Sequence, residues 1–211
     1  MLYLVCSLLH GQGIIKMTGK LKNIFITLFI LAINAILTAQ NIAASGGVLT
    51  VVDSLKLALK NAKHDTTRCN ILSVLAESAS DEEWPVFNEQ LLILAEKNAA
   101  SASSEKKFYL KHLAAALNNA GFLAGNLGDM PKALEYNHKS LKILEEIKDK
   151  KGIAYSLNDI GLIYKNQGNI SKALDYYHKS LKIRVEIKDQ TGIDSSLNNI
   201  GLIYDNQGDI T

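Results

Sequence analysis

Apolar residues in the second half of the chain recur with the period of amphipathic helices. One stripe, at spacings typical of a 3.6-residue turn, consists of Ile153, Leu157, Ile160, Gly161 and Tyr164. A second stripe consists of Ile170, Ala173, Leu174, Tyr177, Leu181 and Val185. Between the stripes, Gly168 is suited to end one helix in a left-handed conformation, and Asn169 is suited to cap the next. The pattern predicts two helices joined by a tight turn.

This helix pair is repeated along the chain. Gly121, Gly161 and Gly201 follow one another at intervals of 40 residues, and residues 138–143 have the same sequence as residues 178–183. A fixed period of about 20–50 residues is typical of stacked units that cannot bury their apolar faces alone. The small residues Gly161 and Ala173 mark where we expect the two helices of a pair to approach closely.

The spacing of these residues resembles the tetratricopeptide repeat. The second copy supplies the family's pattern with Leu157, Ile160, Gly161, Tyr164, Ala173, Tyr177 and Ser180. The first copy departs from it, with Ala120 at the large apolar position, Ala124 at the tyrosine and Asn137 at the aromatic. The resemblance covers residues 104–211 and implies an all-α fold, a right-handed α-solenoid of antiparallel helix pairs. A period of 40 rather than about 34 residues is similar to the long-helix variety of the family.

Residues 1–45 have the pattern of a secretory signal peptide. Lys16, Lys20 and Lys22 precede an apolar stretch over residues 23–37, and small residues follow it. We expect cleavage between Ala39 and Gly46, with Met17 as the true start of the protein. An uncleaved membrane anchor is the alternative, although the stretch is short of the roughly 20 residues that a membrane-spanning helix needs.

Residues 46–103 are predicted to form a diverged helical cap before the repeats at 104–211. Helical stripes run through residues 52–62 and 71–79, and Trp84-Pro85 opens a third helix. The sequence ends at Thr211, where the second helix of the third repeat is due. We therefore expect the third repeat to be truncated and the sequence to be a fragment of a longer protein.

Composition argues against a nucleic-acid partner and against a disulfide framework. The net charge is +2 and charged residues make up 21% of the chain, so no basic face is indicated. Once Cys6 is removed with the leader, Cys69 is left alone among apolar neighbours. A buried core residue is the favoured interpretation of Cys69, rather than a reactive thiol.

The sequence contains no constellation of residues typical of a catalytic site. His138 and His178 recur at equivalent positions of second helices, which suggests a metal ladder, but no carboxylate or cysteine lies at ligand spacing beside them. We interpret them as partly exposed residues copied with the repeat. The sequence therefore predicts a protein that is not an enzyme over this length, and that has neither a cofactor nor a metal site.

Recurring asparagines are the strongest binding candidates. In the tetratricopeptide family the first helices line a concave groove, so the resemblance assigns to that groove Asn118, Phe122, Asn158, Leu162, Lys165, Asn198, Leu202 and Asp205. Side-chain amides at equal intervals can pair with the backbone of an extended peptide. They can equally bridge adjacent helices, and for the first set, Asn118, Asn158 and Asn198, both interpretations stay open. For the second set, Asn126, Asn166 and Asn206, a structural role at the helix ends is favoured.

These observations predict a module outside the cytoplasm that binds a protein or peptide segment in its groove. The order of leader, diverged helices and repeats resembles the N-terminal region of bacterial membrane signalling proteins. The first alternative is therefore the sensor region of a signalling enzyme, such as a kinase or cyclase, whose output domain lies beyond this sequence. A free secreted scaffold is the other. Contact with a membrane is expected only through an uncleaved leader or a later C-terminal segment.

Overall fold

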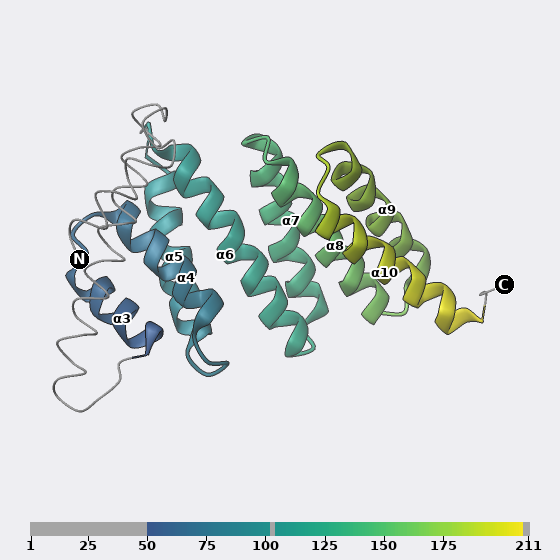
Figure 1. Ribbon diagram of the computed structural model, residues 1–211, viewed down its shortest axis with the longest axis horizontal. Helices are drawn as coiled ribbons and strands as arrows, with labels where there is room; N and C mark the ends of the chain where they lie inside the picture. The colour runs from purple at the N-terminus through teal and green to yellow at the C-terminus, as the bar shows by residue number, and fades with distance from the viewer. Residues whose placement is uncertain (1–49, 102–103, 209–211) are drawn as a thin grey trace, which may run out of the picture. The chain divides into compact units, whose positions relative to one another are not determined.

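The computed structural model describes residues 50–101 and 104–208, and the regular structure in these ranges is entirely α-helical (Figure 1). The helices are α3 (Val51–Asn61), α4 (Asp65–Ser78), α5 (Trp84–Ala99), α6 (Lys106–Asn126), α7 (Met130–Glu146), α8 (Lys150–Asn166), α9 (Ile170–Glu186) and α10 (Gln190–Gln207). None of them is long and apolar enough to cross a membrane. The predicted leader, residues 1–45, lies outside the described residues.

The chain divides into two compact units, residues 1–57 and residues 58–211. Within the second unit, each helix from α4 to α9 packs against the helix that follows it in the chain (Figure 1). The helices α4, α6 and α8 also contact one another in that order, across the intervening helices. This stacking of consecutive helices confirms the predicted all-α solenoid. In the repeats, α6, α8 and α10 are the first helices of their pairs, and α7 and α9 are the second helices.

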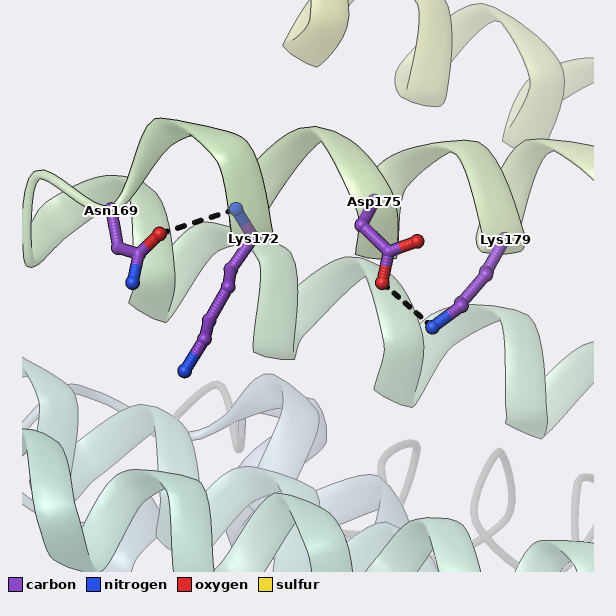
Figure 2. Close-up of polar contacts among 4 residues, drawn as sticks. All are labelled: Asn169, Lys172, Asp175 and Lys179. Carbon is purple, nitrogen blue, oxygen red and sulfur yellow. Dashed lines mark hydrogen bonds and ion pairs between the residues drawn. The ribbon is translucent and has the colours of Figure 1, made fainter.

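Glycine and a capping side chain form the turn inside each pair. Gly168 has a φ of +75°, and the backbone N–H of Asn169 donates to the carbonyl of Tyr164 at 2.9 Å. This closes the C-terminus of α8 in the left-handed arrangement that glycine favours. The Asn169 side chain then accepts from the backbone N–H of Lys172 at 3.2 Å, which caps α9 (Figure 2). Both roles agree with the sequence-based expectation.

The turns between pairs use lysine where the turns inside pairs use glycine. Lys148 and Lys188 both have a φ of +56°, a conformation that side chains other than glycine rarely adopt. In each turn an aspartate follows: Asp149 caps α8 by accepting from Gly152 N at 3.1 Å, and Asp189 caps α10 in the same way at 3.3 Å. The two junctions therefore have one conformation, repeated after 40 residues.

The helices of a pair touch through small residues. A side-chain carbon added to Gly161 would lie 2.8 Å from the ring of Tyr177 and 3.3 Å from the carbonyl of Ala173. Both Ala173 and Tyr177 are completely buried. The predicted close approach at Gly161 and Ala173 is confirmed.

We expect Ala173→Leu to lower the free energy of unfolding by about 1–3 kcal/mol, because a larger side chain must displace the helices around it. Lys182→Leu, on the exposed side of the same helix, is the matched control and is expected to stay within about 0.5 kcal/mol of the parent. Denaturant unfolding followed by circular dichroism measures both. Equal losses would show that the buried face of α9 is misassigned.

One side of α9 differs from the sequence-based expectation. Val185 was predicted in the buried stripe but is 56% exposed, whereas Arg184 is only 1% exposed. The buried positions of α9 are Ala173, Tyr177, Ser180 and Arg184. These positions also have helical spacing, but two of them are polar. A stripe traced through apolar residues alone therefore ends at Val185, one residue after the buried Arg184.

Candidate functional site

The residues assigned to a groove from sequence lie on the first helix of each pair. Helix α6 carries the first two, α8 the next three and α10 the last three. Because equivalent positions recur at the repeat interval, we treat them as one surface and call it the first-helix face. Its members are Asn118, Phe122, Asn158, Leu162, Lys165, Asn198, Leu202 and Asp205.

One apolar side chain per copy reaches the surface in the first-helix face. Phe122 is 59% exposed, Leu202 is 42% exposed, and Leu162 at the equivalent position is half-buried. The ring of Phe122 lies 6.4 Å, between centroids, from that of Trp84 at the start of α5. Exposed apolar residues that recur in register mark a surface suited to contact with another molecule.

The first set of asparagines is partly engaged within the fold. The Asn118 side-chain carbonyl accepts from the hydroxyl of Ser156 at 3.1 Å, which joins α6 to α8. The Asn158 carbonyl accepts from the amide of Asn199 at 3.0 Å, which joins α8 to α10. Asn198 is exposed. Bridging between helices is therefore observed at two of the three positions, and contact with a peptide backbone stays a prediction.

The second set of asparagines, Asn126, Asn166 and Asn206, is exposed near the helix ends. Backbone groups close those ends, as in the bond from Gly128 N to the Gly125 carbonyl at 3.0 Å. Within the described part of the chain, no hydrogen bond engages the side chain of Asn126 or Asn166. Both side chains instead border a pocket on the first-helix face.

This pocket lies among α6, α7 and α8, with a volume of about 90 Å³. It is lined by Gly121, Phe122, Gly125, Asn126, Met130, Asn137, Asp159, Leu162, Ile163 and Asn166. Four of these residues were singled out as binding or structural candidates from sequence. The buried Asn137 and the half-buried Asp159, which supply polar groups to the pocket, were not.

Asn137 stands where the next copy has Tyr177. It is 1% exposed, and its amide donates to the Ala133 carbonyl at 3.0 Å, while its Oδ1 has no hydrogen-bond partner. In the next copy, the Tyr177 ring packs against Gly161, whereas here the Asn137 amide faces Gly121. A shorter side chain at this position leaves space that the tyrosine ring fills in the following pair. Burying an acceptor without a partner costs about 1–3 kcal/mol.

Asp159 is the one formally charged residue in the lining of this pocket. Burial raises the pKa of its carboxyl to about 6, against the opposing effects of a hydrogen bond from Asn158 and the charge of Arg184. The other two copies have Asn119 and Asn199 at this position. Two departures from the repeat pattern therefore indicated the pocket in the sequence. Asp159 has a carboxylate where the other copies have an amide, and Asn137 stands where the next copy has an aromatic residue.

A larger hollow of about 430 Å³ lies among α5, α6 and α7. Its lining is mainly apolar and includes Val86, Ile93 and Leu127, which are 53%, 59% and 77% exposed. It contains none of the residues assigned to the first-helix face. Its polar border combines the acidic Glu89 and Asp129 with Lys132.

The histidines and the cysteine considered as candidates from sequence do not form a site in the described residues. His138 and His178 are exposed on α7 and α9, and the described residues contain no group of three or more potential metal ligands. Cys69 is completely buried in α4, and burial raises the pKa of its thiol to about 11, which keeps it protonated at neutral pH.

Comparison with known proteins relates the repeats to one family. The family model described as tetratricopeptide repeat matches residues 112–186. No curated protein sequence matches the chain.

Two solved structures share the fold at low identity. The crystal structure of BtubC (BKLC) from P. vanneervenii aligns with a TM-score of 0.58 and 18% identity, over 74% of this chain and 65% of that one. A Signal Transduction ATPase with Numerous Domains protein with a tetratricopeptide repeat sensor, PH0952 from Pyrococcus horikoshii, aligns with a TM-score of 0.57 and 19% identity. That match covers 82% of this chain but 25% of the other. The chain thus spans less than two thirds of either protein.

Proposed function

Residues 112–186 of this chain are tetratricopeptide repeats, and from that premise we propose that the first-helix face binds a segment of another protein. Repeats of this family generally mediate contacts between proteins. The observation that carries the proposal is the row of apolar side chains, one per copy, at Phe122, Leu162 and Leu202. Covering such a row with a partner removes apolar surface from water, which favours association.

Polar residues beside this row provide the means to hold and select a segment. Asn198 is exposed and offers both a donor and an acceptor, as a peptide backbone requires. At one recurring position the three copies have Gly125, Lys165 and Asp205, so the charge differs from copy to copy. We propose that these differences select the side chains of the bound segment.

The experiment that tests this function is selection of short random peptides, displayed on phage, against the immobilised chain. Selected peptides are then measured by fluorescence anisotropy. Phe122→Ser is expected to weaken their binding by about 10-fold to 100-fold, the equivalent of about 1.5–3 kcal/mol for an aromatic side chain buried on binding. The melting temperature is expected to stay near that of the parent, because Phe122 is already 59% exposed.

Val185→Ser is the matched control, since Val185 is 56% exposed on the second helix α9. It is expected to leave the affinity unchanged. Peptides that lose affinity equally in both variants, or a library that yields no binders, would contradict binding at the first-helix face.

We propose that the protein acts outside the cytoplasm. The support is the basic, apolar and small-residue order between Lys16 and Ser45. When the gene is expressed in a bacterium with its own leader, we expect intact-mass spectrometry to show a mature N-terminus between Ala39 and Gly46. A periplasmic product that still begins at Met1 or Met17 would contradict export by cleavage.

The alternative is that this chain is the sensor region of a membrane signalling enzyme. The order of leader, diverged helices and repeats supports it by resemblance. The coding sequence beyond Thr211 tests it. An apolar span of about 20 residues followed by a catalytic domain would favour the sensor. A polar capping helix followed by a stop codon would favour a free secreted scaffold.

A further inference from the structure

We propose that the pocket between α6 and α8 binds the cationic end of a lysine or arginine side chain from the bound protein segment, with Asp159 and Asn137 as its polar contacts. The proposal rests on the proposed function. It adds the type of residue that the bound segment carries and the point on the first-helix face where that residue binds. The pocket opens beside Phe122 and Leu162, so a segment lying along the first-helix face passes over it.

The pocket has the size and walls for the end of one side chain. Its volume of about 90 Å³ holds a few atoms rather than a whole small-molecule ligand. Phe122, Met130, Leu162 and Ile163 give it apolar walls, which suit the methylene groups of a long side chain. Asp159 and Asn137 lie among these walls in the lining of the pocket.

The polar groups of the pocket are hydrogen-bond acceptors, so a ligand must supply a hydrogen-bond donor. The Oδ1 of Asn137 is a buried acceptor that has no partner, and the Asp159 carboxylate is an acceptor when ionised. Lysine and arginine side chains are donors only, so neither would leave an acceptor of its own unpaired. A glutamate or aspartate would add a second negative charge beside Asp159 and would be repelled.

The charge of the pocket favours a cation over a neutral donor. Asp159 is the one charged residue in its lining, and partial burial disfavours its ionised form, while the charge of Arg184 nearby favours it. A cation beside it would stabilise the carboxylate. At the mouth, the exposed ring of Phe122 offers a face that attracts a cation.

Comparison of the copies distinguishes this pocket from the equivalent place in the following pair of described helices. In the following pair, the ring of Tyr177 is completely buried against Gly161, and Asn199 replaces the carboxylate and bonds to Asn158. One specific pocket on an otherwise periodic face would fix the register of a bound segment. A lysine or arginine therefore sets where along the repeats the segment lies.

The test uses the full chain and the same phage-displayed random peptides. We expect the selected peptides to share a lysine or arginine. Replacing that residue by the uncharged norleucine should weaken binding by about 10-fold to 100-fold, the usual range for hydrogen bonds to a charged group. Asp159→Asn should cause a similar loss for lysine or arginine peptides and no loss for their norleucine versions. Asparagine is the residue of both other copies, so this variant is expected to fold.

Asn137→Tyr is the second variant, because it fills the pocket with the ring that Tyr177 provides in the next copy. It should abolish the preference for lysine or arginine while circular dichroism shows an intact helical fold. If peptides are selected but carry no shared basic residue, or if their basic residue contributes as much to binding of both variants as to binding of the parent, the pocket proposal is overturned and the proposed function stands. If no peptide is selected, both are overturned.

Discussion

Replacing Arg184 by leucine is expected to stabilise the repeats by about 1–4 kcal/mol, whereas replacing Leu144 by arginine is expected to destabilise them by about 3–5 kcal/mol. The two residues occupy equivalent positions in successive copies, and both are buried, with 1% and 4% exposure. Each packs against an equivalent glycine, Gly192 or Gly152. Chemical denaturation of the two variants measures the free energies of unfolding.

The expectation follows from how the buried cation is held. Arg184 donates to the Gly192 carbonyl and, at 3.2 Å, to the Ser196 hydroxyl, but its Nε has no partner. Its guanidinium lies 5.1 Å from the centre of the Tyr155 ring, and within the described residues it forms no ion pair. The direct contacts of Arg184 are all neutral groups, and a buried charge held in this way is usually less stable than an apolar side chain of similar size.

An arginine at position 144 would lack the aromatic contact, because the position equivalent to Tyr155 is Ala115 in the first copy. The sign of the change in the free energy of unfolding decides the prediction. A loss of stability in Arg184→Leu would contradict it and show that the contacts of the buried arginine stabilise the second copy.

Truncation of Tyr177 to alanine is expected to cost about 3–5 kcal/mol, the usual loss for a large aromatic residue removed from a core. The ring is completely buried and packs with Ala173, Ile200 and Ile203, which joins two helix pairs. Thermal and denaturant unfolding should both show the loss.

Tyr177→Phe separates the ring from its hydroxyl. The hydroxyl is buried without a hydrogen-bond partner, and burial raises its pKa to about 12. Its removal is therefore expected to leave stability unchanged or slightly higher. If phenylalanine proved as destabilising as alanine, the hydroxyl would have a partner that the ring packing does not reveal.

The helices and their ends follow from local patterns, which explains why the sequence predicted them well. Gly168, Asn169 and Asp189 act within a few residues of their own positions, and each has the role its residue type favours. Close approach at Gly161 and Ala173 was also predictable, because only small residues suit the contact between paired helices.

The pocket was harder to predict because its parts come from different helices. The departure of Asn137 from the aromatic pattern was visible in the sequence, but the space it leaves depends on α6 and α8 closing around it. The burial of Arg184 in place of Val185 is similar, since apolar periodicity alone gives no reason to bury a charge. Both misses concern polar residues inside the helical packing.

The matching junctions at Lys148 and Lys188 have a genetic consequence. Because both turns have a φ of +56° and are followed by an equivalent aspartate cap, a DNA segment encoding residues 149–188 begins and ends at the same structural point. Unequal recombination between coding stretches for similar repeats would add or remove one whole helix pair and leave the same turn at the junction. The length of such an array can therefore change between generations in steps of one repeat.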